Sequence, residues 1–130
     1  MKIGGRTVLI VDRERVVLRC VAATLRHFGF VVLTAESVRE VFALCNHPIG
    51  DIDLALLDAP DMSGPDARDC LQRAFPGIRI LRLSAYSSGL ALANDGWLYK
   101  PFSAPQLVQR VRAALSRPQP DYDLVTPLRP

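Results

Sequence analysis

Short apolar runs alternate with longer segments of helical spacing along most of this chain, and this alternation constrains its fold more than any other feature. The predicted strands are 7–11, 30–34, 53–58, 78–83 and 97–99, and the predicted helices begin near Glu14, Ser37, Pro65, Ser87 and Ser103. Most of these strands are continuously apolar, which is typical of strands buried on both faces. The order therefore predicts an α/β domain with a parallel sheet and helices on both faces.

Local signals mark several of the predicted ends. Ser37 with Glu40, and Ser103 with Gln106, have the spacing of a helix capping box. The helix predicted over 87–95 has barely two turns, so we expect a shortened fourth helix. Arg79 and Arg82 interrupt the apolar run at 78–83, which predicts a strand more exposed than its neighbours.

The length of 130 residues, with 49% hydrophobic and 22% charged residues, indicates one globular domain, predicted over 1–116. Residues 117–130 contain four prolines and are predicted to form a flexible tail, with a docking segment as the alternative. We expect a stand-alone domain, since this length leaves no room for a separate output domain. Neither a membrane span nor a signal peptide is evident, so we expect a cytoplasmic protein that does not contact membranes.

The basic residues are scattered, although the net charge is +3 and the sequence pI is about 9.0. Without a basic run or interleaved aromatic residues, direct nucleic-acid binding is not expected. The three cysteines, Cys20, Cys45 and Cys70, are widely spaced and predicted to be reduced thiols that pack in the domain. Lys100 is the only lysine besides Lys2, so an ammonium replaces the usual guanidinium at a single interior position.

Polar side chains stand where the predicted strands end. Asp12 follows the first strand, Asp58 ends the third, Ser84 follows the fourth, and Lys100 follows the fifth. In open parallel sheets functional groups collect outside the carboxyl ends of the strands. We therefore expect two carboxylates, a hydroxyl and a lysine to meet at one edge of the sheet.

These motifs, namely Val-Leu-Ile-Val-Asp12, Asp53-Leu-Ala-Leu-Leu-Asp58, Leu83-Ser84-Ala-Tyr and Lys100-Pro-Phe, resemble the receiver domain of bacterial response regulators. The resemblance covers nearly all of 7–115. It implies a flavodoxin-like, doubly wound sheet of five parallel strands in the order 2-1-3-4-5. It also implies two-component phosphorelay signalling, with a sensor histidine kinase or phosphotransfer protein as donor and a downstream partner protein.

The resemblance implies a role for each residue at the predicted site. Asp58 would accept the phosphoryl group, Ser84 and Lys100 would bind it, and Trp97 would be the switch aromatic. Mg²⁺ would be held by acidic residues after the first strand together with Asp58. A carboxylate can attack a phosphoryl donor while fixed cations neutralise the phosphoryl oxygens, so the residue types suit this chemistry.

The sequence departs from the family pattern directly after Asp12, where Arg13 occupies the position of a direct metal ligand. A guanidinium cannot ligate Mg²⁺. With Asp12, Arg13, Asp58 and Lys100 charged, the formal charges of the pocket sum to zero. We therefore expect an atypical receiver domain whose Mg²⁺ site at Asp12 and Asp58 is weak or absent, with Glu14 as an alternative acidic residue in the pocket.

Two other functions stay open. The first is a receiver-like protein-binding module that works without phosphorylation, favoured by Arg13 and by loops shorter than the family pattern. The second is a phosphohydrolase that forms an aspartyl enzyme, suggested by the two acids of Asp12-Arg-Glu14. A non-enzymatic domain remains the expectation, and a homodimer is an alternative state of assembly.

Overall fold

The computed structural model describes residues 5–47, 50–58, 65–84, 97–99 and 103–116, with residues 58, 65–66, 83–84 and 97–99 described by backbone alone. The strands are β1 (Thr7–Val11), β2 (Val31–Ala35), β3 (Leu54–Asp58), β4 (Arg79–Ser84) and β5 (Trp97–Tyr99). The helices are α1 (Arg15–His27), α2 (Val38–Asn46), α4 (Pro65–Ala74) and α5 (Ala104–Leu115). The predicted α/β class is confirmed. The shortened helix predicted over 87–95 lies outside the described residues.

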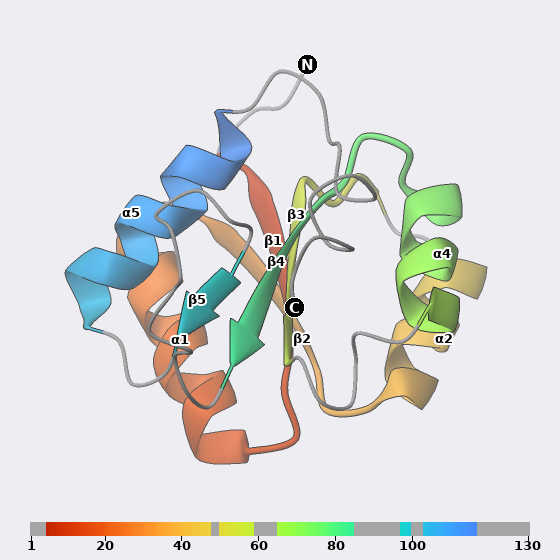
Figure 1. Ribbon diagram of the computed structural model, residues 1–130, viewed down its shortest axis with the longest axis horizontal. Coiled ribbons are helices and arrows are strands. Elements are labelled where there is room, and N and C mark those ends of the chain that lie inside the picture. The colour runs from red at the N-terminus through yellow and green to blue at the C-terminus, as the bar shows by residue number, and fades with distance from the viewer. Residues whose placement is uncertain (1–4, 48–49, 59–64, 85–96, 100–102, 117–130) are drawn as a thin grey trace.

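The strands form one parallel sheet in the order β2-β1-β3-β4-β5, so β2 is an edge strand. Helices α1 and α5 cover one face of this sheet, and α2 and α4 cover the other (Figure 1). Two apolar clusters follow from this layering, since successive strand residues point to opposite faces. Ile10 and Leu56 join α1 and α5 in one cluster, while Leu9 and Leu57 join α2 and α4 in the other.

Helix α1 shows how sequence spacing becomes packing. Its buried residues are Leu18, Val21, Ala22 and Leu25, which recur at helical period and face the sheet. The helix ends at His27 with Phe28 as its C-cap, and the next residue, Gly29, has a φ of +95°, the left-handed conformation that favours glycine. Cys20 lies off the buried stripe and is exposed, so the prediction that it packs in the domain is wrong.

Strands β2, β3 and β4 each begin one residue later than predicted, and β2 and β4 do so for the same physical reason. The N–H of Phe30 donates to Leu25 O at 3.0 Å, and the N–H of Ile78 donates to Phe75 O at 2.9 Å. Each of these residues completes the turn that closes the preceding helix. The strands therefore run over 31–35 and 79–84 instead of 30–34 and 78–83.

The prediction of an exposed fourth strand is wrong for Arg82, which is only 5% exposed. Strand β4 lies between β3 and β5, and Ile80 on the same strand packs in the cluster under α2 and α4. Arg82 is buried because its strand lies in the interior of the sheet, although its side chain is polar. Among the described residues, none of the helices has the length and apolar character needed to cross a membrane.

Candidate functional site

The strand register brings the predicted site residues toward one edge of the sheet. Val11 of β1 lies opposite Leu57 of β3, so the next residues along each strand are Asp12 and Asp58. Asp58 in turn lies opposite Leu83 of β4, which places Ser84 one position further toward the same edge. Neighbouring strands lie about 4.8 Å apart, so the backbones of these three residues are close.

The fifth strand continues this arrangement. Ser84 lies opposite Tyr99, and Lys100 follows Tyr99 directly in the chain but lies outside the described residues. Trp97 lies opposite Arg82, two positions back from the edge that carries Ser84. The backbone positions of Asp12, Asp58 and Ser84 thus lie together at the carboxyl edge of the sheet. Trp97 lies about two residues further back along the strands, away from that edge.

Asp12 is the site residue whose side chain the structure fixes most firmly. It is fully buried, and its Oδ1 accepts the N–H of Glu14 at 2.9 Å. Its own N–H donates to Ala35 O of the edge strand at 3.1 Å. Helix α1 has Glu14 as its N-cap residue, and the Glu14 side chain makes no capping hydrogen bond. The Asp12 carboxylate therefore supplies an acceptor and a negative charge at the start of α1.

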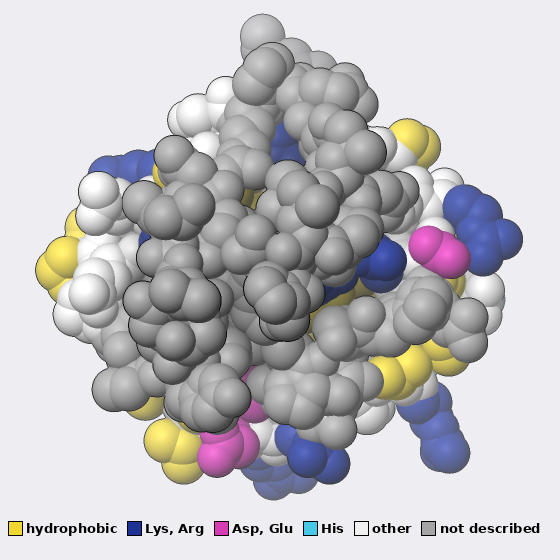
Figure 2. Space-filling view, viewed as in Figure 1, with side chains coloured by type: hydrophobic (Ala, Val, Ile, Leu, Met, Phe, Trp, Pro, Cys, Tyr) yellow, Lys and Arg dark blue, Asp and Glu magenta, His cyan; other side chains and the backbone are white. Residues whose placement is uncertain are grey.

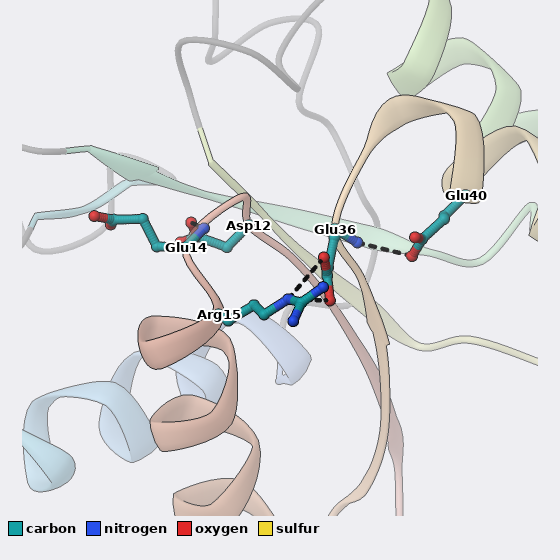
Figure 3. A network of polar contacts seen from close by, with 5 residues as sticks. All are labelled: Asp12, Glu14, Arg15, Glu36 and Glu40. Carbon is teal, nitrogen blue, oxygen red and sulfur yellow. Dashed lines mark hydrogen bonds and ion pairs between the residues drawn. The ribbon is translucent and has the colours of Figure 1, made fainter.

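Arg13 and Glu14 are both exposed. The Glu14 side chain points away from Asp12 and from Arg15 (Figure 3). Mg²⁺ needs several oxygen ligands in near-octahedral geometry. The Arg13 side chain has no oxygen that could bind the ion, and Oδ1 of Asp12 already accepts a hydrogen bond from the Glu14 N–H. The described part of the chain contains no cluster of three or more His, Cys, Asp or Glu that could hold a metal ion. Arg13 and the outward-pointing Glu14 side chain therefore do not fit the role of a second Mg²⁺ ligand beside Asp12.

A polar network borders the site where β2 ends. Arg15 Nε lies 3.3 Å from Glu36 Oε2, and the N–H of Glu36 donates to Glu40 Oε1 at 2.9 Å (Figure 3). In the space-filling view, acidic and basic side chains stand next to each other along the lower rim (Figure 2). The described surface beside the site therefore carries charges of both signs.

Arg82 is a buried cation that the sequence pattern did not assign to the site. It precedes Ser84 by two residues on β4 and is 5% exposed. The available signal was a single arginine near the carboxyl end of an apolar strand. That signal could not be used, because the sequence does not show that β4 is an interior strand.

Comparisons with known proteins show the family of this chain. The family model described as the response regulator receiver domain matches residues 8–112. A probable transcriptional regulatory protein, TcrX of Mycobacterium tuberculosis, is 34% identical over 85% of this chain and 50% of its own length. The transcriptional regulatory protein CusR of Escherichia coli is 36% identical over 84% of this chain and 51% of its own length. The chain thus spans about half the length of these curated relatives.

Solved structures show the same fold. A response regulator from Thermotoga maritima superposes with a TM-score of 0.69 at 27% identity, covering 87% of this chain and 99% of that one. A response regulator receiver protein from Sinorhizobium medicae has a TM-score of 0.69 at 22% identity, covering 85% of this chain and 94% of that one. The second likeness supports the fold alone.

Proposed function

This chain belongs to the response regulator receiver domain family, and from that premise we propose that Asp58 is its phosphoacceptor. The observation that carries the proposal is the strand register, which sets Asp58 between Asp12 and Ser84 at the carboxyl edge of the sheet. The phosphoryl donor would be a sensor histidine kinase or a phosphotransfer protein. Receiver domains are typically signalling modules, and this one would act on a downstream partner protein.

The proposed transfer is a single displacement at phosphorus. A carboxylate oxygen of Asp58 forms a new O–P bond while the N–P bond of the donor phosphohistidine breaks. The imidazole leaves with the electron pair of that bond and takes up a proton. Lys100 and the Ser84 hydroxyl would bind the phosphoryl oxygens and neutralise their charge, which is the main catalytic requirement of such a step. Trp97 would report the change as the switch aromatic.

Receiver domains typically bind Mg²⁺ at the phosphorylation site. The misfit of Arg13 and the Glu14 side chain supports an atypical pocket in which that ion is held weakly or not at all. We place the Arg13 charge near the Asp12 and Asp58 carboxylates, where a guanidinium would reduce their mutual repulsion. No step of the proposed mechanism depends on a metal ion.

A second candidate function rests on the presence of Arg13 beside Asp12 in place of an acidic residue. If the Arg13 guanidinium permanently takes the place of the metal ion, the domain would work as a protein-binding module without phosphorylation.

The proposal also includes the complete doubly wound fold of order 2-1-3-4-5, a cytoplasmic location, and a homodimer as an alternative assembly. The pairing of β4 with β5 supports the first of these.

The decisive experiment is incubation with a small acyl phosphate, with and without Mg²⁺, followed by intact-mass measurement and Trp97 fluorescence. We expect an adduct of one phosphoryl group that is absent in Asp58→Asn, and that forms weakly even at Mg²⁺ concentrations that saturate ordinary receivers. Arg13→Asp should raise the affinity for Mg²⁺ and the yield of the adduct.

Each other outcome has a distinct meaning. A fully labelled wild type that Arg13→Asp does not change would refute the proposed pocket. If neither the wild type nor Arg13→Asp forms the phosphoryl adduct, and the domain still binds its partner protein, the phosphorylation-independent module would be favoured. Turnover of a phosphate ester would instead support the aspartyl-enzyme phosphohydrolase.

A further inference from the structure

The edge strand β2 carries backbone groups that face away from the sheet. Val31 donates its N–H to Arg6 O at 2.9 Å, and Ala35 O accepts from Asp12, so these residues face β1. Strand alternation then directs the N–H and C=O of Val32 and Thr34 outward. Arg26 Nη2 donates to Val32 O at 3.2 Å, and this is the only hydrogen bond to these outward groups within the described residues. Such an edge can accept another strand.

Two grooves lie on either side of this edge. The groove on the α1 side has a volume of about 440 Å³ and is lined by Arg15, Arg19 and Arg26. The groove on the α2 side has a volume of about 600 Å³ and is lined mainly by apolar groups, including those of Leu33, Ala43 and Leu44, together with the polar side chains of Arg26, Glu40 and His47. Arg26 and Thr34 line both grooves, so the outer edge of β2 is the ridge between them. Side chains of an added strand would enter the two grooves alternately.

The two grooves differ in charge, and this difference selects the kind of strand that fits. Among the described residues, Glu36 is the only acidic residue that lines the α1-side groove, and its carboxylate lies 3.3 Å from Arg15 Nε. Arg26 is held by a carbonyl, and Arg19 has no ion pair among the described residues. Three guanidinium groups against one carboxylate leave this groove positive. A complementary strand therefore has acidic residues at alternate positions and apolar residues between them.

A sequence with this alternation occurs in the chain itself, at Asp121-Tyr-Asp-Leu-Val-Thr126. We propose that residues 121–126 add to β2 of the same molecule as a further parallel strand. Asp121 and Asp123 would enter the basic groove on the α1 side, and Tyr122 and Leu124 the apolar groove on the α2 side. Pro127 follows this segment and has no N–H with which to continue the pairing.

The position of α5 makes this connection short. The guanidinium of Arg112, in the last turn of α5, lies 5.8 Å from the centre of the Phe28 ring. Phe28 is the C-cap of α1 and precedes β2 by three residues, so the last turn of α5 lies beside the end of α1 that leads into β2. The four residues between Ser116 and Asp121 can span up to about 17 Å. That span exceeds the diameter of one helix, about 10–12 Å, which is the obstacle to be passed.

Amide hydrogen exchange of the 130-residue chain, measured by NMR, tests the proposal residue by residue. The outward amides of Val32 and Thr34 should exchange about tenfold or more slowly in the wild type than in Asp123→Arg. The inward amides of Val31 and Leu33 should be equally protected in both proteins, because they face β1. They also show that the variant is folded.

Charge reversal supplies the matched controls. Arg19→Asp should lose the protection of Val32 and Thr34, and the double variant Arg19→Asp with Asp123→Arg should recover it. Arg39→Asp, at an exposed position of α2 that lines neither groove, should leave it unchanged. Equal exchange of Val32 and Thr34 in the wild type and Asp123→Arg would overturn the proposal. Protection that increases with protein concentration would also overturn it, since the strand would then come from a second copy.

Discussion

Asp12 combines two duties in one side chain. It stands at the edge where Asp58 and Ser84 end their strands, and it also accepts the N–H of Glu14 at the start of α1. A fully buried carboxylate is stable only when it is hydrogen-bonded or near positive charge. The bond to Glu14 meets part of this need and ties the geometry of the site to the first turn of α1.

A pair of substitutions separates the hydrogen bond of Asp12 from its charge. Asp12→Asn keeps an acceptor oxygen for the Glu14 N–H, whereas Asp12→Ala removes it. We expect the free energy of unfolding of Asp12→Ala to be about 1–2 kcal/mol lower than that of Asp12→Asn. Urea denaturation followed by circular dichroism measures the difference. Equal stabilities would mean that the bond to Glu14 contributes nothing.

We expect Cys45 to make the stability of the domain depend on pH in the alkaline range. Burial, together with a hydrogen bond to the Cys70 thiol, raises the pKa of Cys45 from 9.0 to about 12. The unfolded chain loses this proton at lower pH than the folded chain, so the free energy of unfolding should fall as pH rises from 9 toward 12. Urea denaturation at about pH 8 and about pH 10 should show a smaller loss in Cys45→Ala. Cys20→Ala, at an exposed thiol, should retain the wild-type loss; identical losses in all three proteins would contradict the assignment.

At the scale of single elements, hydrogen bonds at the helix starts decide where several helices begin. In α5, Ser103 Oγ accepts the N–H of Gln106 at 3.2 Å, and Gln106 Oε1 accepts the N–H of Ser103 at 2.8 Å. The capping box predicted from their spacing is confirmed. In α2 only half of it forms, because the Glu40 carboxylate accepts from Glu36 instead of Ser37.

Removing the cap of α5 should weaken the domain measurably. Ser103→Ala leaves the N–H of Gln106 without its acceptor and should lower the free energy of unfolding by about 0.5–2 kcal/mol. Ser116→Ala is the matched control at the other end of the same helix, where the hydroxyl donates to Arg112 O. Its effect should stay within about 0.5 kcal/mol. Thermal or urea denaturation provides the measurement, and equal effects at both serines would argue against the capping box.

At the scale of the whole molecule, the sheet divides the core into two clusters. Ile10 of β1 belongs to the cluster under α1 and α5, and Ile80 of β4 belongs to the cluster under α2 and α4. Strand β3 lies between β1 and β4, so the two side chains are separated by a strand as well as by the sheet. The two halves of the core should therefore respond independently to small changes in volume.

Double substitutions test this independence. Ile10→Val and Ile80→Val should each lower the free energy of unfolding by about 0.5–1.5 kcal/mol. Their combined effect should equal the sum of the single effects within about 0.5 kcal/mol, because they share no partners. Ile78→Val with Ile80→Val, two residues of one cluster, provides the coupled comparison. A large interaction energy between Ile10 and Ile80 would mean that the sheet transmits strain between its faces.

The sequence by itself determined the features that depend on local periodicity. Apolar runs and helical stripes predicted the α/β class, and the same runs placed residues such as Asp12 and Asp58 at strand ends. Capping signals predicted the start of α5. These features depend on neighbours within a few residues along the chain, so the order of residues contains the information.

Only the tertiary structure decided which groups are buried, paired or left open. Arg82 is buried because β4 lies inside the sheet, Cys45 meets Cys70 because α2 packs on α4, and β2 is the edge strand of the described sheet. Phe30 and Ile78 complete helix ends instead of starting strands. Each outcome depends on segments far apart in the sequence coming together in space, and short-range periodicity contains no record of those contacts.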